Sequence, residues 1–158
     1  MEKHPMTPEG FERLREELRR LKHDERPRVI QEIATAREHG DISENAEYHA
    51  AKERQGLIEA RIKELEAKIS RADVIDPKQV GGSDRIQFGA QVTVVDEDTE
   101  KESTYRIVGA DEGDIQAGRL SFSSPLARAL MGKSVGQSVE ISTPSGVRSY
   151  EITKVQYG

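Results

Sequence analysis

Apolar residues in the first half of the chain recur at steps of three and four, the spacing that gathers them on one face of a helix. Ahead of this stripe, Thr7-Pro8-Glu9 combines a capping oxygen, a proline in the first turn and an acid near the helix N-terminus. The pattern loses phase near Pro27, which predicts a kink or a restart of the helix, and it ends at Gly40. The stripe consists of Phe11, Leu14, Leu18 and Leu21, and it resumes at Val29, Ile30 and Ile33.

A second apolar stripe follows steps of seven, four, three, four and three, with Glu, Lys and Arg on its flanks, as in a coiled-coil seam. Gly56 is its weakest helical position. Because the connection between the stripes is short, we expect the two helices to fold back as an antiparallel hairpin over residues 1–76. About 30 residues would make each arm roughly 45 Å long, with residues 40–44 at the tip. The seam contains Ala51, Ile58, Ile62, Leu65, Ile69 and Ala72.

The period changes to two after Asp76-Pro77, which ends the helical pattern and opens a linker over residues 77–85. Segments 96–101 and 143–146 have the composition of hairpin loops. Between the strands, "SSPLARALMGKSVG" predicts a short helix with Ser124 as its cap, Pro125 at its first position and Gly132 as its stop. The fold class is therefore α+β with two domains, the hairpin and a small strand-plus-helix domain over residues 86–158. Alternation is seen at Ala90, Val92 and Val94, at Tyr105 and Ile107, at Leu120 and Phe122, at Val139 and Ile141, and at Tyr150 and Ile152.

Composition narrows the function classes. The chain has no cysteine, no apolar leader-like segment and no run of eighteen apolar residues, so we expect a cytoplasmic protein without membrane contact. The net charge of −5 is spread along the chain, with 15 basic against 17 acidic residues in 1–75 and 9 against 12 in 76–158. A freestanding nucleic-acid binder usually carries a basic domain, so any contact with nucleic acid should be local or arranged by a partner.

The tip allows two interpretations. Gly40 suits the left-handed residue after a helix, and Asp41 followed three residues later by Glu44 resembles a capping box. Alternatively, the two carboxylates are hard oxygen ligands of the kind that Mg²⁺ prefers, although they fill only one or two of its six positions. An exposed arm could then carry half of a metal site that a partner completes. Spacing alone leaves both interpretations open.

Three segments resemble one known family: "AREHGDISENAEYHAAKERQ", then "IEARIKELEAKIS", and "SPLARALMGK" near the C-terminus. They resemble the Gre family of bacterial transcript-cleavage factors, over essentially the whole chain and in the same domain order. The most specific part is the tip motif G-D-x-x-E-N-x-x-Y. Members of this family insert the hairpin into the secondary channel of backtracked RNA polymerase. The polymerase then cuts the RNA near its displaced 3′ end.

The resemblance implies roles for the tip residues. Asp41 and Glu44 would be the catalytic pair that shares a Mg²⁺ with the polymerase, so the chain alone would bind no cofactor and would not be an enzyme. Arg37 and Lys52 would contact RNA phosphates, unless they are ordinary solvated residues. Asn45 and Tyr48, with Gly40, would shape the tip. His39 and His49 lack the spacing of a metal site and are expected to be structural or solvated.

The resemblance also implies an FKBP-like C-terminal domain that docks on the polymerase rim through Ser124, Pro125 and Arg128. Prolyl isomerases share that fold, but the domain has few aromatic residues to line a pocket, so we expect no isomerase activity. Two further alternatives stay open: a homologue that enters the channel and inhibits the polymerase, and a coiled-coil adaptor whose tip acids are only caps. The near-neutral arm predicts a limited basic patch, and we expect a monomer.

Overall fold

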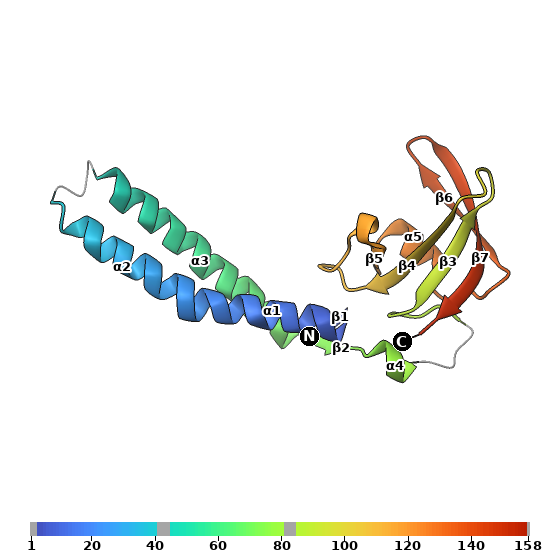
Figure 1. Cartoon of the computed structure of the whole chain (residues 1–158), viewed down its shortest axis with the longest axis horizontal. Coiled ribbons are helices and arrows are strands. Elements are labelled where there is room, and N and C mark those ends of the chain that lie inside the picture. Colours follow the sequence, from blue (N-terminus) through green and yellow to red (C-terminus); the bar gives the residue numbers. More distant parts are fainter. Residues whose placement is uncertain (1–2, 41–44, 81–84, 158) are drawn as a thin grey trace. The chain divides into compact units, whose positions relative to one another are not determined.

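The computed structural model describes residues 3–40, 45–80 and 85–157 of the 158-residue chain. It divides into two compact units (Figure 1). One unit comprises Phe11–Arg71, and the other combines Glu2–Gly10 with Ala72–Gly158. The first ten residues therefore group with the C-terminal sheet, whereas the sequence pattern had assigned them to the hairpin. None of the described helices is both long and apolar enough to cross a membrane.

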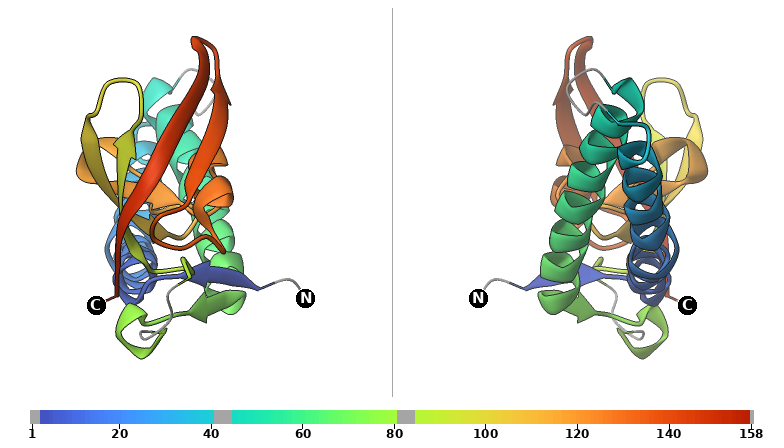
Figure 2. Two further views of the ribbon diagram at one scale, coloured as in Figure 1. Left: turned by 90° about the vertical axis from the view of Figure 1, so that its right-hand side faces the viewer. Right: turned by 90° about the vertical axis from the view of Figure 1, so that its left-hand side faces the viewer.

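Unit Phe11–Arg71 consists of two antiparallel helical arms that lie side by side in Figures 1 and 2. The first arm runs through α1 (Pro8–Arg20), a π-helical segment (Leu21–Glu25) and α2 (Arg26–Arg37), and the second is α3 (Ala46–Ser70). The predicted stripes meet between them in two clusters. One cluster contains Leu21, Ile62 and Leu65 with Leu14, Leu18 and Ile58, and the other contains Val29, Ile33 and Ala51 with Tyr48 and Ile58.

The π-helical segment explains why the first stripe loses phase. Eight α-helical residues from Leu21 to Val29 would rotate the chain by about 800°, which is about 80° more than two full turns. A π turn is wider and advances less per residue, so both Leu21 and Val29 can face α3. The N–H of Arg26 bonds to the oxygen of Leu21, and Pro27 then sits in the first turn of α2, where its missing N–H costs little. Pro27 thus neither breaks the arm nor ends it.

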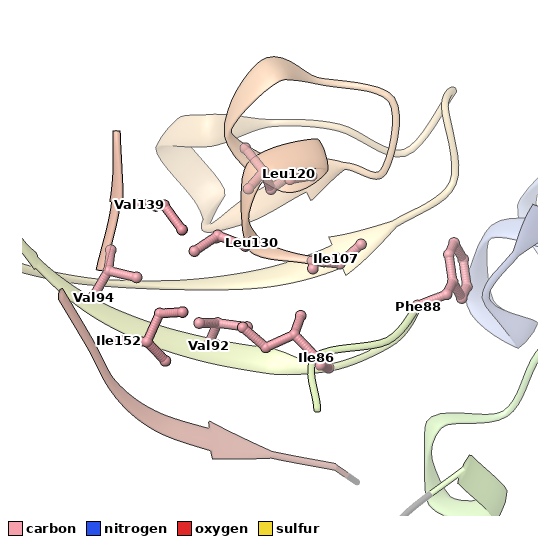
Figure 3. Close-up of a cluster of buried hydrophobic side chains, with 11 residues drawn as sticks. Ile86, Phe88, Val92, Val94, Ile107, Leu120, Leu130, Val139 and Ile152 are labelled. Atoms are coloured by element: carbon pink, nitrogen blue, oxygen red, sulfur yellow. The ribbon is translucent and has the colours of Figure 1, made fainter. Parts of the chain in front are cut away.

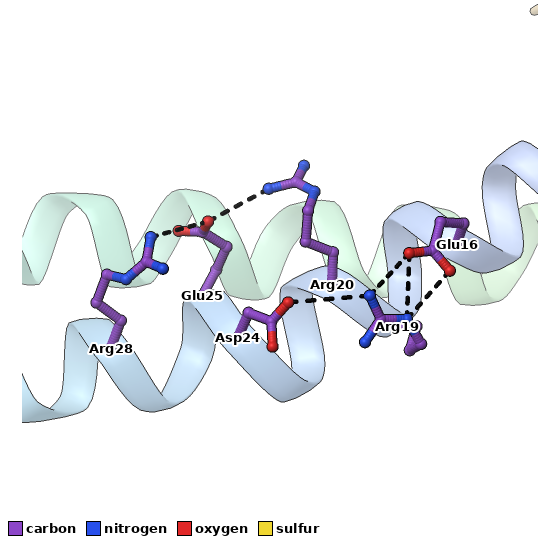
Figure 4. A network of polar contacts seen from close by, with 6 residues as sticks. All are labelled: Glu16, Arg19, Arg20, Asp24, Glu25 and Arg28. Atoms are coloured by element: carbon purple, nitrogen blue, oxygen red, sulfur yellow. Dashed lines mark hydrogen bonds and ion pairs between the residues drawn. The ribbon is translucent and has the colours of Figure 1, made fainter.

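Ion pairs flank the seam on both sides. Arg61 forks onto Glu17 at 2.7 and 2.8 Å, and Arg26 forks onto Glu59 at 2.8 and 2.7 Å. Two further pairs cross between the arms, Lys22 with Glu66 at 3.2 Å and Arg54 with Glu32. Exposed pairs within the first arm add to this pattern in Figure 4, which shows Glu16, Arg19, Arg20, Asp24, Glu25 and Arg28. Many of the arm's cations are therefore neutralised locally, in accord with the near-neutral count.

The other unit is built on a five-stranded sheet in the order β5-β4-β3-β7-β6. Its strands are β3 (Gln91–Asp96), β4 (Glu102–Val108), β5 (Arg119–Ser121), β6 (Ser138–Thr143) and β7 (Gly146–Gln156). The β3–β4 and β6–β7 pairs are antiparallel hairpins across the two predicted loops, and β4 pairs with β5 in parallel. Helix α5 (Pro125–Leu130) buries Ala127 and Leu130 in the core. Figure 3 shows Leu130 among the core side chains. The predicted strands and helix are confirmed.

Two short strands were missed in the sequence. Strand β1 (His4–Met6) pairs in parallel with β2 (Ala72–Val74), so the chain segments before α1 and after α3 are tied to each other. The prediction that Ala72 belongs to the helical seam is therefore wrong, because α3 ends at Ser70 and Ala72 begins β2. The predicted linker also contains structure, since α4 (Pro77–Val80) places Pro77 against Gly89. Each of these strands has only three residues and lies within two residues of a helix, so the helical pattern obscures it.

Candidate functional site

Asn45 joins the two helix ends at the tip of the arms. Its Oδ1 accepts a hydrogen bond of 3.1 Å from the N–H of Tyr48, which makes it the N-cap of α3. Its Nδ2 donates a hydrogen bond of 2.6 Å to the oxygen of Ala36 in the last turn of α2. One side chain thus satisfies an orphan donor in the first turn of α3 and also bonds to a main-chain oxygen in the last turn of α2. The cap of α3 is Asn45 rather than Asp41, so the capping-box interpretation chose the wrong cap residue.

Tyr48 and Arg37 face each other across the same helix ends. The Arg37 guanidinium lies 5.8 Å from the centre of the Tyr48 ring, and the His49 ring meets that ring edge-on at 5.5 Å. Tyr48 also packs against the cluster of Val29, Ile33 and Ala51. A tyrosine in this position holds Arg37 at the tip while its own ring is anchored by the seam.

Gly40 has a φ of +100°, the left-handed conformation expected after the end of α2, and a β-carbon there would meet nothing within 4 Å. Backbone conformation rather than space is therefore what favours glycine. The two predicted catalytic residues, Asp41 and Glu44, lie outside the residues that the structure describes. Lys52 is exposed on α3 and donates a hydrogen bond of 3.2 Å to Gln55.

The donor chemistry at the tip fits Mg²⁺ only as a partial site. Among residues 3–40, 45–80 and 85–157, no group of three or more His, Asp or Glu residues could hold a metal ion. Two carboxylates, Asp41 and Glu44, are hard oxygen donors that suit Mg²⁺, but the ion takes six ligands. Any such ion at this tip would need donors from another molecule.

A groove of about 540 Å³ opens between α2 and α3 near the tip. The ion pair between Arg54 and Glu32 lies in its wall. No sequence pattern pointed to this groove, because its lining residues are the ordinary polar flanks of the two stripes. They are Arg28, Gln31, Glu32 and Thr35 with Ala36 from α2, and Glu47, Ala50 and Arg54 from α3.

The second predicted site lies on α5 in the sheet unit. The Ser124 hydroxyl oxygen accepts a hydrogen bond of 3.3 Å from the N–H of Ala127, and Pro125 is the first helical residue, as predicted. The helix is anchored by its buried Ala127 and Leu130, whereas Arg128 is exposed. The structure therefore brings Ser124, Pro125 and Arg128 together on one short element, with the arginine available to a partner.

Sequence comparisons agree with this architecture. The model of an N-terminal transcription elongation factor domain matches residues 4–74, and that of a GreA/GreB C-terminal domain matches residues 81–157. Both models describe transcription elongation factors. The chain belongs to the GreA/GreB family of these factors.

Relatives support the assignment over the full length. Transcription elongation factor GreA of Beijerinckia indica is 60% identical and that of Caulobacter sp. is 61% identical, each over 157 residues and 99% of both chains. Among solved structures, GreA/GreB from Nitrosomonas europaea is 22% identical, covers 98% of this chain and 100% of its own, and has a TM-score of 0.43. The GreA factor homolog Gfh1 of Thermus thermophilus is 26% identical, with coverages of 98% and 99% and a TM-score of 0.43.

Proposed function

We propose that this transcription elongation factor stimulates RNA cleavage by backtracked bacterial RNA polymerase. In this proposal the arms form a coiled-coil hairpin that enters the secondary channel, and the FKBP-like sheet unit docks at the channel rim. Full-length identity of about 60% to factors named GreA supports the assignment. The observation that carries it to a particular site is the pair of helix ends joined by Asn45, between which Asp41 and Glu44 fall in the sequence.

Asp41 and Glu44 are proposed as the half of a metal site that this chain supplies. When bound, the Mg²⁺ shared with the polymerase would be one of two ions, of which one activates a water molecule and the other stabilises the leaving oxygen. The two carboxylates bring negative charge and hard oxygen donors to the ion. They act only together with donors of the polymerase, so the chain is proposed to have no cleavage activity alone.

Arg37 and Lys52 are proposed to contact the phosphates of the nascent RNA near its 3′ end. Arg37 offers a planar fork of donors held beside the Tyr48 ring, and Lys52 offers a point charge on α3. Because the cross-arm pairs neutralise many other cations of the arms, binding of RNA would be confined to the tip. Ser124, Pro125 and Arg128 on α5 are proposed to contact the polymerase, in a monomeric cytoplasmic factor.

A backtracked elongation complex with RNA labelled at its 3′ end tests the proposal. We expect the wild-type chain with Mg²⁺ to release short 3′ fragments, and Asp41→Asn and Glu44→Gln to release few, although both still compete with wild type for polymerase. Glu38→Gln removes an exposed acid at the end of α2 and serves as the matched charge control; it should cleave like wild type. Equal loss in Glu38→Gln would show that net tip charge, rather than the two named acids, matters.

An inhibitory role in the same channel is the second candidate, and the same assay separates it. A chain that competes for polymerase and slows elongation but releases no fragments on an active cognate polymerase would be an inhibitor. The tip motif, which keeps both acids, favours cleavage. The adaptor alternative would be supported if Asp41→Asn and Glu44→Gln left the function of the chain intact.

A further inference from the structure

The sheet unit contains a buried carboxylate that the proposed mechanism does not use. Glu112 is 9% exposed and follows β4, and Thr7, which is 3% exposed, precedes α1. Glu112 accepts hydrogen bonds from the N–H groups of Thr7 at 3.0 Å and Gly109 at 2.9 Å, and from the Thr7 hydroxyl. The Thr7 hydroxyl oxygen accepts in turn from the N–H of Gly10, at 3.0 Å. The start of α1 is thus capped twice, first by Thr7 and behind it by Glu112.

Two glycines make room for this carboxylate. A β-carbon on Gly10 would collide with the Glu112 carboxyl group, and one on Gly109 would lie 2.6 Å from its Oε2 and 2.9 Å from the oxygen of Pro5. Neither position has an unusual φ, so the reason for glycine is space rather than conformation. Three donors and the missing β-carbons of two glycines therefore define one position for the Glu112 carboxyl group.

Strands β1 and β2 place this contact where the arms begin and end. β1 leads into α1, β2 follows α3, and the N–H of Ile75 extends their pairing with a bond of 2.9 Å to Met6. Gly109 approaches β1 so closely that its added β-carbon would lie 3.3 Å from the Cα of Met6. The Glu112 carboxylate therefore fastens the β1–α1 junction to the loop after β4. That junction is the first of the two points at which the chain passes between the arms and the sheet unit.

We propose that Glu112 is a positioning residue for transcript cleavage: it fixes the first turn of α1, the helix with which the first arm begins. This inference rests on the proposed function. It assigns Glu112 a part in the step after docking, because α5, not the β1–α1 junction, carries the proposed polymerase contact. Loss of the Glu112 bonds should consequently lower the cleavage rate at saturating factor more than it changes the factor concentration needed for half-maximal rate.

Amide hydrogen exchange in the free full-length chain tests the contact without polymerase. Glu112→Gln has the same shape but places an NH₂ group among donors, so protection of the Thr7 and Gly109 amides should fall on the order of ten-fold, as for a lost buried bond. Gly10→Ala should have the same effect by displacing the carboxylate. Thr7→Ser keeps the hydroxyl group and should retain amide protection. Thr7→Val has nearly the same shape as threonine but lacks the hydroxyl group, so it should lose protection with little other change to the fold.

Asp96 offers a matched control for general weakening of the sheet unit. It is also buried, at 7% exposure, and it accepts from the N–H groups of Asp98 and Thr99 in the β3–β4 loop and from Arg148. Asp96→Asn should lower the melting temperature as Glu112→Gln does. It should leave the Thr7 amide protected and the cleavage rate at saturation near the wild-type value.

The cleavage assay then decides the inference. The inference is supported by three results together. The saturating rate falls several-fold in Glu112→Gln, Gly10→Ala and Thr7→Val; Thr7→Ser retains the wild-type rate; and the half-saturating concentration of the factor changes little. Wild-type saturating rates in variants that have lost amide protection overturn it, as does an equal loss of rate in Asp96→Asn. Failure of wild type itself to cleave would refute the proposed function and, with it, the part in cleavage; the exchange data would still decide the contact.

Discussion

The side-chain amide of Asn45 donates a hydrogen bond of 2.6 Å to the main-chain oxygen of Ala36, nine residues earlier in the chain. Ala36 is buried, and its oxygen also accepts from the N–H of His39 at 3.1 Å. The end of α2 and the start of α3 are therefore coupled by a side chain that belongs to the tip motif. The spacing of the two helix ends, between which the proposed catalytic acids fall in sequence, depends on this bond.

Asn45 has two functions that substitution can separate. Asn45→Asp keeps an oxygen to cap the Tyr48 N–H but replaces the donor to Ala36 with a second acceptor, whereas Asn45→Ala loses both bonds. We expect Asn45→Ala to lower stability by about 1 kcal/mol, the usual cost of an N-cap. Both variants should reduce the cleavage rate, measured on backtracked complexes. Near-wild-type cleavage by Asn45→Asp would show that the bond to Ala36 is dispensable.

The contact between Arg37 and Tyr48 predicts that the ring, and not its hydroxyl, supports cleavage. Tyr48→Phe should cleave like wild type. Tyr48→Leu keeps apolar packing on the seam but removes the ring face, worth about 0.5–1 kcal/mol at an exposed site, and should lower the rate roughly two- to five-fold. Measuring Tyr48→Leu with Arg37→Ala in a double-mutant cycle provides the check. Additive effects would mean that the two residues act independently.

Long periodic segments carried most of what the sequence could predict. The alternating strands and the Ser124-Pro125 helix start are confirmed, and so are most members of the stripes, because local spacing determines them. Two stripe members were wrong: Ile30 is 51% exposed, and Ala72 lies in β2 after the end of α3. The contact between Glu112 and Thr7 joins residues 105 positions apart, and nothing in the local pattern around either residue signals it. The hydrogen bond from Asn45 to the oxygen of Ala36 likewise has no signal in the local sequence pattern.

The tip shows a different limit. Asp41 and Asn45 can each cap a helix, and the spacing of Asp41 and Glu44 resembles a capping box. The choice of Asn45 depends on where α2 ends and on a carbonyl of α2 within reach, which is tertiary information. The assignment of the two acids to catalysis rested on the resemblance, and it stays a prediction.

Acid should loosen the arms through their cross-arm pairs. The hydrogen bonds from Arg61 lower the pKa of Glu17, and those from Arg26 lower the pKa of Glu59. A carboxyl whose pKa is lowered in the folded state stabilises it fully above its ordinary value of 4.5, and this contribution is lost as pH falls through the lowered pKa. Glu17→Gln should therefore reduce the fall in melting temperature between pH 7 and pH 3.

The size of this effect should be small for the Glu17–Arg61 pair, about 0.2–1 kcal/mol, because both side chains remain partly exposed. Thermal unfolding of the full chain followed by far-ultraviolet circular dichroism measures it. Glu12→Gln is the control, since Glu12 pairs with Arg15 on the same helix rather than across the arms. The same pH dependence in Glu17→Gln and wild type would contradict a role for the cross-arm pair.

We expect the π-helical segment to depend on the spacing of the apolar stripe and not on Pro27. Pro27→Ala alone should leave it in place and change stability by less than about 1 kcal/mol, because an α-helical path would turn Val29 away from α3. Deleting the exposed His23 shortens the step from Leu21 to Val29 to seven residues, about 700°, which suits a straight α-helix.

That deletion alone should be destabilising, since Pro27 would then lie inside an uninterrupted helix and clash with a carbonyl of the preceding turn. The deletion combined with Pro27→Ala should recover most of the loss, although the two changes are separated by three residues. Melting temperatures of the four chains, wild type included, measure the coupling between the two changes. If the double variant is no more stable than the deletion variant, the clash of Pro27 does not explain the stability lost on deletion of His23. The π-helical segment must then serve another contact of the arms.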